Sequence, residues 1–271
     1  MGWLYGYYSE DPNFPDGVRV NVEAIYEPPQ IGELKGVQPL EDPFRPTVDM
    51  VASALSLERV GYIFTSLNQE KTFLTGDQVR TIAALQQEHL VDHPCGPKVS
   101  KFITVRVEQQ ENDQIGVECW MASDSCQALE RDNVFGGCEA AAKMAVREPK
   151  RTEAMPAVLR EGAGVTEFET DFMIVSLAHG QPNENNTQFN ILKRYDYPVM
   201  NRFGKEQTQN DFTNFLRGSK GLKTSHERFA CFNFLLHLSK VMDVDTAITI
   251  ATNIVDERPI DAALVELLET F

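Results

Sequence analysis

The sequence predicts an α+β fold, with a mixed sheet flanked by helices over residues 1–190 and a small, mainly helical domain over residues 191–271. Three observations support this prediction. Short segments in the first part alternate apolar and polar residues, as half-buried strands do. Segments between them carry apolar residues at helical spacing. Beyond residue 211 helical patterns dominate, and 271 residues with 42% hydrophobic residues suffice for a sizeable core.

The chain opens with a predicted hairpin of strands 3–8 and 18–26, because both segments are rich in aromatic or β-branched residues. Asp11-Pro12-Asn13 and Pro15-Asp16-Gly17 between them are turn sequences. Pro28 and Pro29 end the second strand, since proline cannot donate to a ladder. A proline-punctuated loop is expected to follow, up to about residue 46.

Helices and strands then alternate. Thr47 is a suitable N-cap for a helix over 48–57, and the apolar run from Arg59 to Leu67 indicates a buried strand. The remaining elements are expected as a helix over 75–89, strands over 101–107 and 116–122, a helix from about Ser125, a charged surface excursion over 147–166, a strand over 171–177, and helices over 211–217, 225–241, 245–256 and 260–268.

Composition narrows the possible partners and compartments. The formal net charge of −15 disfavours nucleic acid and anionic membrane surfaces, and it keeps the protein soluble. No apolar run reaches the roughly 20 residues of a membrane-spanning helix, and the N-terminus lacks the pattern of a signal peptide. The five cysteines contain no CxxC pair, so reduced thiols in the cytosol or nucleus are expected.

Several segments resemble the nuclear protein localisation protein 4 family. The residues that carry the resemblance are Gly2-Trp3-Leu4-Tyr5-Gly6, Val22-Glu23-Ala24-Ile25-Tyr26-Glu27-Pro28-Pro29-Gln30-Ile31-Gly32 and Arg59-Val60-Gly61-Tyr62-Ile63-Phe64-Thr65-Ser66-Leu67, with weaker matches at residues 72–75, 100–104 and 123–129. The signal covers roughly the first half of the chain and thins beyond about residue 145.

The resemblance implies that residues 1–190 form an MPN (JAB1/MPN-like) domain. Active members of that fold are zinc deubiquitinases, whose metal is held by a His-x-His pair and an aspartate, with a glutamate as general base. Here Phe64, Ser66 and Gln78 stand at the ligand positions, and the glutamate would lie upstream of Gly2. Phenyl, hydroxyl and amide groups are poor zinc ligands. We therefore expect no enzyme activity, no metal and no cofactor.

The resemblance also implies a binding groove for an unfolded ubiquitin segment at the former catalytic centre, by strand addition to a sheet edge. The candidate contact residues are Tyr26, Glu27 and Gln30 at the strand exit, with Phe64 and Thr65 on the former catalytic strand. The helical part would contact folded ubiquitin. For Tyr26 and Phe64 an equally plausible interpretation is that they are core aromatics, because large rings usually pack inside.

The family further implies partners. These are ubiquitin and polyubiquitin chains, ubiquitin fusion degradation protein 1 and the valosin-containing AAA ATPase, in ubiquitin-dependent and endoplasmic-reticulum-associated degradation. Family members carry an N-terminal ubiquitin-like domain and zinc-binding segments that serve ATPase docking, and this sequence lacks both. If the chain is complete, direct docking is in doubt; if it is a fragment of a longer protein, docking resides in the other segments. We expect it in the cytoplasm and nucleus, and peripherally at the endoplasmic reticulum.

Two alternatives remain open. His89, His93 and Cys95 could make a divergent zinc deubiquitinase, although a polar helix end with a histidine near its C-terminus explains the same residues more simply. The chain could also be an inactive MPN scaffold subunit, like those of the proteasome lid. His237 lies in the apolar run 232–238 and is expected to be a hydrogen-bonded core histidine.

Overall fold

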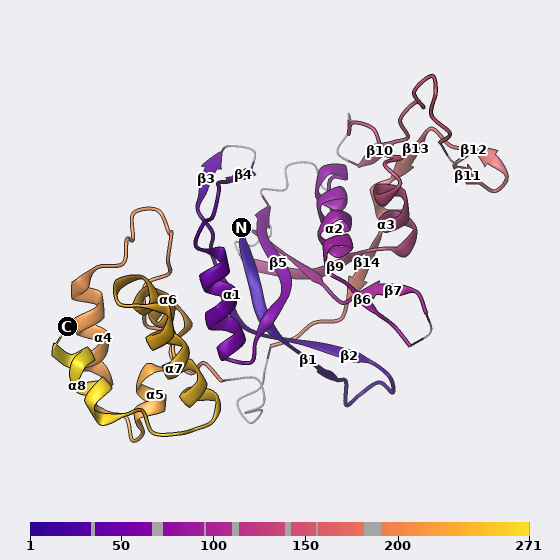
Figure 1. The fold of residues 1–271 in the computed structure, drawn as a ribbon. Helices are drawn as coiled ribbons and strands as arrows, with labels where there is room; N and C mark the ends of the chain where they lie inside the picture. Colours follow the sequence, from indigo (N-terminus) through magenta and orange to yellow (C-terminus); the bar gives the residue numbers. More distant parts are fainter. Residues whose placement is uncertain are drawn as a thin grey trace. The chain divides into compact units, whose positions relative to one another are not determined.

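The computed structural model describes residues 1–33, 36–66, 73–94, 96–109, 114–138, 142–155, 157–181 and 191–270 (Figure 1). The chain folds into two compact units. Unit 1 joins residues 1–63 to residues 181–271, and unit 2 comprises residues 64–180. The chain therefore leaves unit 1 after its first strands and returns to it for the C-terminal helices.

The strands of unit 1 are ordered around β1 (Gly2–Glu10), which pairs in antiparallel fashion with β2 (Val18–Tyr26) and β5 (Glu58–Ser66). The β1–β2 register jumps between Tyr5↔Ala24 and Gly6↔Val22, so Glu23 is the extra residue of a β-bulge. A Cβ atom at Gly6 would collide with the carbonyl group of Asn21, which explains the glycine opposite this bulge.

A short hairpin follows the strand exit. Its strands are β3 (Gln30–Glu33) and β4 (Gly36–Pro39). The next element, α1 (Arg45–Ala54), begins earlier than the sequence predicts. Thr47 is therefore not its N-cap but lies in the first turn, where Pro46 supplies a fixed φ.

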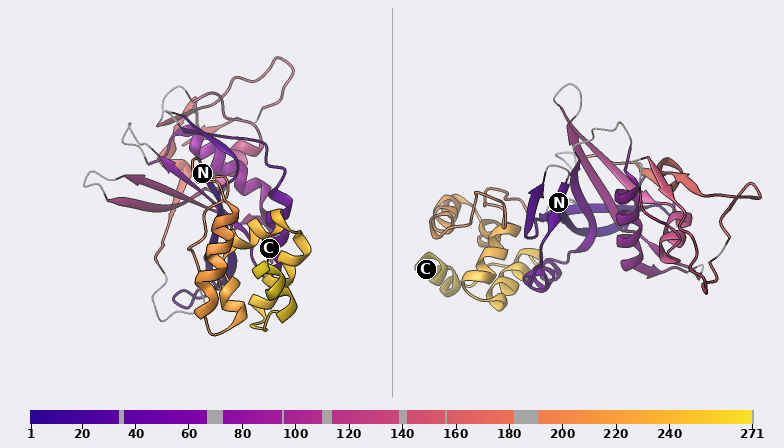
Figure 2. Two further views of the ribbon diagram at one scale, coloured as in Figure 1. Left: turned by 90° about the vertical axis from the view of Figure 1, so that its left-hand side faces the viewer. Right: turned by 90° about the horizontal axis from the view of Figure 1, so that it is seen from above.

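The C-terminal part of unit 1 is helical, as predicted, and its helices lie together in both views of Figure 2. They are α4 (Gln209–Gly218), α5 (Ser225–Phe229), α6 (Phe232–Val241), α7 (Val244–Val255) and α8 (Ala262–Thr270). The single helix predicted over 225–241 is wrong, because Ala230 and Cys231 leave helical geometry and divide it into α5 and α6.

One hydrophobic core runs through unit 1. It includes Tyr5 and Tyr26 from one face of the strands, Val51 from α1, and Phe234 and Ile250 from α6 and α7. Alternation along β1 and β2 sends these rings to the helical side. The sheet and the C-terminal helices thus share one core, whereas a domain boundary near residue 190 stays a prediction.

Unit 2 is built on β8 (Ile103–Gln109), β9 (Ile115–Ala122) and β14 (Ile174–Leu177), and β9 pairs in antiparallel fashion with both β8 and β14. Helices α2 (Gly76–Glu88) and α3 (Asp124–Arg131) contact each other, and α2 packs on β9. The core lies between them and includes Ile82, Trp120 and Met144. The predicted strand over 171–177 is shorter than expected, because Thr170–Met173 form a 3-10 turn (η1) before β14.

Unit 2 also contains three small two-stranded sheets. They are β6 (Leu90–Asp92) with β7 (Lys98–Ser100), β10 (Lys143–Ala145) with β13 (Glu167–Glu169), and β11 (Leu159–Arg160) with β12 (Ala163–Gly164). The last hairpin forms within the predicted surface excursion over 147–166.

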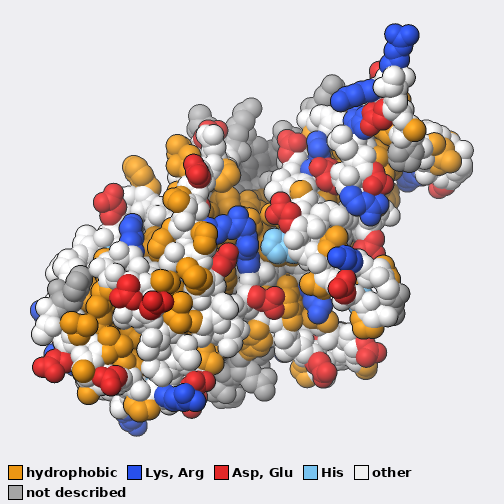
Figure 3. All heavy atoms as spheres, viewed as in Figure 1, with side chains coloured by type: hydrophobic (Ala, Val, Ile, Leu, Met, Phe, Trp, Pro, Cys, Tyr) orange, Lys and Arg blue, Asp and Glu red, His pale blue; other side chains and the backbone are white. Residues whose placement is uncertain are grey.

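The architecture confirms the predicted α+β class and is consistent with an MPN-like fold followed by a helical region. On the face shown in Figure 3, acidic and basic side chains are interspersed with apolar ones. In the described part of the chain, every helix is too short or too polar to cross a membrane. The described cysteines, Cys119, Cys126, Cys138 and Cys231, are free thiols.

Candidate functional site

Strand β5, which is expected to match the MPN ligand strand, ends with Phe64, Thr65 and Ser66. Phe64 is half-buried and packs against the core of unit 2, so it fills space rather than offering a donor atom. Ser66 is half-buried as well, and Thr65 is exposed. Neither the phenyl ring nor a neutral hydroxyl is a ligand that zinc prefers.

Gln78, which is expected to stand at the third ligand position, forms a capping interaction at the start of α2. Its side-chain oxygen accepts a hydrogen bond from the backbone N–H of Thr75 at 2.9 Å. The Thr75 hydroxyl accepts one from the backbone N–H of Gln78 at 3.3 Å. This reciprocal capping box satisfies two amide groups at the helix start. Gln78 thus has a structural role, which the Thr-x-x-Gln spacing signals in the sequence.

Two further groups beside the start of α2 could be considered as ligands. Asp77 is exposed, and Cys138 is hydrogen-bonded to it. Burial, followed by the charge and hydrogen bond of Asp77, raises the pKa of the Cys138 thiol to about 11. Asp77 and Cys138 supply two donor groups, one fewer than the three protein ligands of a catalytic zinc site. The residues present do not fit a catalytic zinc site.

The alternative cluster around His89 is also used for packing. His89 is the C-cap of α2, where its Nδ1–H donates to the carbonyl oxygen of Leu85 at 2.7 Å. Its ring stacks on Phe102 with centroids 4.0 Å apart. This confirms the simpler interpretation of a histidine at a helix C-terminus. Cys95 lies outside the described residues, and no group of three potential metal ligands occurs among those described.

Strand β2 ends at Tyr26, whose side chain packs in the core. This side chain is 0% exposed, so it is a core aromatic in this structure. Its hydroxyl donates to Asp42 Oδ1 at 3.2 Å and accepts from Asn201 Nδ2 at 3.3 Å. Burial, with the charge of Asp42, raises the pKa of the phenol. Tyr26 can therefore position the neighbouring residues Asp42 and Asn201, but its own side chain is not accessible to a ligand.

Glu27 and Gln30 continue this exit and are half-buried. The Glu27 carboxylate forms an ion pair with Arg202, and its backbone carbonyl accepts from Asn201 Nδ2 at 3.0 Å. Gln30 Nε2 donates to the carbonyl oxygens of Met1 and Pro28 at 2.9 and 3.2 Å. The structure thus brings Tyr26, Glu27 and Gln30 together in unit 1, whereas Phe64 and Thr65 are neighbours in unit 2.

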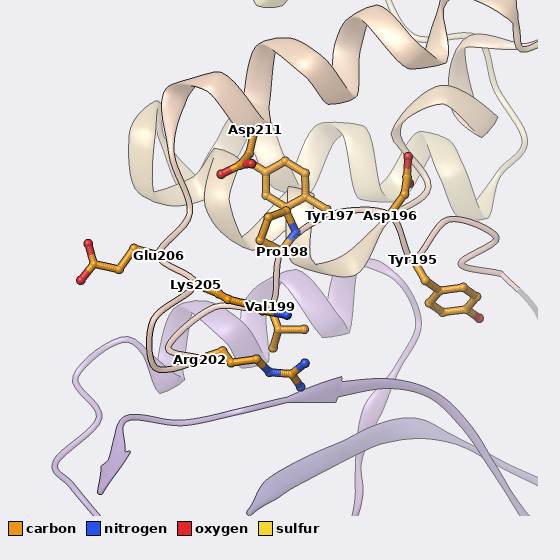
Figure 4. Close-up of a pocket in the computed structure, with 9 residues that line it drawn as sticks. All are labelled: Tyr195, Asp196, Tyr197, Pro198, Val199, Arg202, Lys205, Glu206 and Asp211. Carbon is orange, nitrogen blue, oxygen red and sulfur yellow. The ribbon is translucent and has the colours of Figure 1, made fainter.

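An open cavity of about 500 Å³ lies beside the loop that carries Arg202. Figure 4 shows the Tyr197 ring and Pro198 at its centre, the carboxylates of Asp211 and Glu206 on one side, and Arg202 below. Its lining mixes both charges with aromatic rings. Tyr197 lines the cavity but is almost fully buried, and its hydroxyl is hydrogen-bonded to His237 Nδ1. The prediction that His237 is a hydrogen-bonded core histidine is therefore confirmed.

Comparison with known proteins decides the family. A family model described as the NPL4 family matches residues 1–267 of this chain. The chain belongs to the NPL4 family. The sequence motifs indicated this family from the first half of the chain alone, but the match continues through the C-terminal helices.

Curated family members support the assignment. Over 289 residues the chain is 28% identical to the nuclear protein localization protein 4 homolog of Homo sapiens, covering 95% of this chain and 47% of the relative. The Drosophila melanogaster homolog is 30% identical over 275 residues, covering 89% and 41%. The Saccharomyces cerevisiae protein is 25% identical over 282 residues, covering 89% and 48%. The chain spans about half the length of the curated relatives it matches.

Sequence reasoning missed Asn201 and Arg202, which bind Tyr26 and Glu27 at the end of β2. Both lie more than 170 positions from their partners Tyr26 and Glu27. The available signal is weak: Asn201 adopts a φ of 62°, which asparagine tolerates better than most residues. No pattern in the sequence pairs this turn with the prolines after β2.

Proposed function

We propose that this chain is a non-catalytic module that binds ubiquitin and polyubiquitin. It is part of a substrate-recruiting cofactor of the valosin-containing AAA ATPase. This cofactor acts with ubiquitin fusion degradation protein 1 in ubiquitin-dependent and endoplasmic-reticulum-associated degradation. The support is membership of the NPL4 family together with the side chains at the former catalytic centre. The proposed location is the cytoplasm and nucleus, with peripheral association at the endoplasmic reticulum.

One observation carries the non-catalytic part of the proposal. The amide of Gln78 stands where a carboxylate would bind metal, and its oxygen is already used by the N–H of Thr75. Recruiting it to a cation would break the capping box, at a cost of about 1 kcal/mol. Phe64 contributes no donor atom at all, and a hydroxyl such as Ser66 is a weak ligand. A centre without ligands can hold a polypeptide but has no means to activate water.

The proposed contact residues, together termed the ubiquitin path, lie at the end of β2 in unit 1 and at the end of β5, where Phe64 and Thr65 belong to unit 2. Glu27 and Gln30 present half-buried polar groups there, and Thr65 is the exposed member of the former ligand strand. Tyr26 acts from beneath as a positioning residue, because its hydroxyl links Asp42 to Asn201. Phe64 supports the strand through the core of unit 2. An extended ubiquitin segment would gain backbone hydrogen bonds and side-chain contacts at the end of either strand.

A pull-down with lysine-linked polyubiquitin tests the proposal. Thr65→Arg places a long cation on the exposed side of the path without disturbing a buried group, and it should weaken retention about tenfold. Thr152→Arg makes the same change at an exposed position in the surface excursion and should bind as the unmodified chain does. Equal retention of both variants would place ubiquitin elsewhere, and no retention by the unmodified chain would remove the proposal.

The catalytic alternative is tested on the same preparation. Metal analysis of the purified protein should find no stoichiometric zinc, and a fluorogenic isopeptide substrate should stay intact. Either a tightly held zinc ion or measurable cleavage would overturn the assignment of a binding role. A constitutive heterodimer with another MPN protein, without affinity for ubiquitin, would instead favour the scaffold alternative.

A further inference from the structure

Strand β9 is longer than the strand that covers its outer edge. On one side, residues Ile115–Trp120 pair with Gln109–Thr104 of β8. On the other side, β14 pairs only with the second half of β9, from Leu177↔Cys119 to Ile174↔Ala122. Among the residues that the structure describes, the stretch 115–118 therefore has a strand on one side only.

An uncovered β edge presents backbone N–H and C=O groups at the spacing of a strand, and proteins usually protect such edges with lysine, proline or a bulge. The stretch Ile115-Gly116-Val117-Glu118 has no lysine or proline, and its register with β8 runs without interruption. Its one charged side chain, Glu118, is ion-paired with Arg106. Ile115 is 75% exposed and Val117 is 45% exposed. Because they are two residues apart, both side chains lie on the same face of the ribbon.

On the opposite face of β8 and β9, a network of ion pairs and hydrogen bonds around Arg106 stabilises the two strands. Arg106 on β8 is almost fully buried and forms ion pairs of 2.9 Å with Glu108 and with Glu118. It also donates to the carbonyl oxygen of Phe73, and Trp120 Nε1 donates to Glu118 at 3.2 Å. The edge is thus attached to a buried network, so a strand added to it would meet a preorganised partner.

We propose that residues 115–118 of β9 bind an extended polypeptide segment, which adds as a strand in line with β14 and antiparallel to β9. The edge offers backbone groups along a line, and only an extended chain can satisfy them in sequence. Apolar β-branched residues of the segment would face Ile115 and Val117. The net charge of −15 favours a segment that also carries Lys or Arg, and it disfavours a second copy of this chain.

This surface goes beyond the proposed function, because its ligand is an extended segment of apolar and basic residues, whether or not that segment belongs to ubiquitin. It also lies on β9, apart in sequence from the residues proposed for the ubiquitin path. Loss of peptide binding at β9 and loss of polyubiquitin retention are therefore separate results.

Amide hydrogen exchange of the full chain tests the proposal directly. The probe is a synthetic decapeptide that alternates valine with threonine and lysine, and a scrambled peptide containing proline is the control. The alternating peptide should slow exchange in the stretch 115–118 by about tenfold or more, because added ladder bonds protect amides. Unchanged exchange there at saturating peptide would overturn the proposal.

Substitutions locate the contact. The double change Ile115→Lys with Val117→Lys places charges on the edge and should weaken peptide binding about tenfold in fluorescence anisotropy. Leu159→Lys, at a side chain 61% exposed in the β11 hairpin of the same unit, is the matched control and should bind normally. Should the double variant melt early, Val117→Thr keeps β propensity and should still weaken binding measurably.

Two results would contradict the inference. The first is equal affinity of the unmodified chain and the edge variants, which would place the peptide elsewhere. The second is a dimer of the unmodified chain that disappears in the double variant, measured by sedimentation. That result would make a second copy of this chain the occupant.

Discussion

Replacing Glu23 with glutamine is expected to stabilise unit 1 at neutral and alkaline pH. Glu23 is the extra residue of the β2 bulge and is only 5% exposed. Its Oε2 accepts a hydrogen bond from the backbone N–H of Ile191 at 3.2 Å. Its Oε1 is buried and has no hydrogen-bond partner among the described residues. Burial raises the pKa of this carboxyl from 4.5 to about 7, against the opposing effect of the Ile191 hydrogen bond.

The sign and size follow from linkage. An acid whose pKa is raised by folding holds its proton longer in the folded protein than in the unfolded chain. Stability is therefore full below about pH 4.5 and falls as the pH rises towards 7. A rise from 4.5 to about 7 corresponds to a loss of about 3 kcal/mol at most, at 1.36 kcal/mol per pKa unit. Glutamine has the same shape, stays neutral, and its oxygen can still accept from Ile191.

Urea unfolding at several pH values from 4 to 8 measures the effect. The chain has two tryptophans, so Trp3 reports on unit 1 when Trp120 is replaced by phenylalanine. The Glu23→Gln variant should match the parent at pH 4 and exceed it by up to about 3 kcal/mol at pH 8. Glu206→Gln removes one exposed carboxylate and is the control. Parallel stability curves for Glu23→Gln and its parent would refute the reasoning.

Three further predictions concern single residues. Thr75→Ala removes the α2 capping box and should lower the free energy of unfolding by about 1 kcal/mol, measured by urea titration. Arg106→Met removes the partner of the partly exposed carboxylates of Glu108 and Glu118 and should cost about 1.5–3 kcal/mol, seen as early melting in calorimetry. Burial, aided by Lys240, lowers the pKa of His237. In the Glu23→Gln background, stability should therefore fall as the pH drops below 6.5, and His237→Gln should remove that slope.

Much of the local structure could be predicted, because it depends on neighbouring residues. The Pro28-Pro29 pair ends β2, and Asp243 caps α7 by accepting from the N–H of Thr246 at 2.7 Å. The break between α5 and α6 could not be predicted. Apolar periodicity runs through Ala230 and Cys231, and only packing in the core of unit 1 bends the backbone there.

The candidate site was predictable to the same extent. The side chains of Phe64, Ser66 and Gln78 are neutral, and this can be read from the sequence. The prediction of a poor zinc site therefore follows from the resemblance and from the ligand preference of zinc. The burial of Tyr26 did not follow from the sequence. A tyrosine at a strand exit can face either way, and its position depends on which helices cover the strand.

The sequence by itself determined the family and the α+β class, because these depend on residue types and short spacings. Only the tertiary structure shows that Asn201 and Arg202 bind the end of β2 and that Glu23 accepts a hydrogen bond from the N–H of Ile191. It also shows that β14 pairs with only the second half of β9. Each of these joins residues far apart in the chain. Contacts of that kind arise from the packing of whole elements, which local propensity and periodicity do not encode.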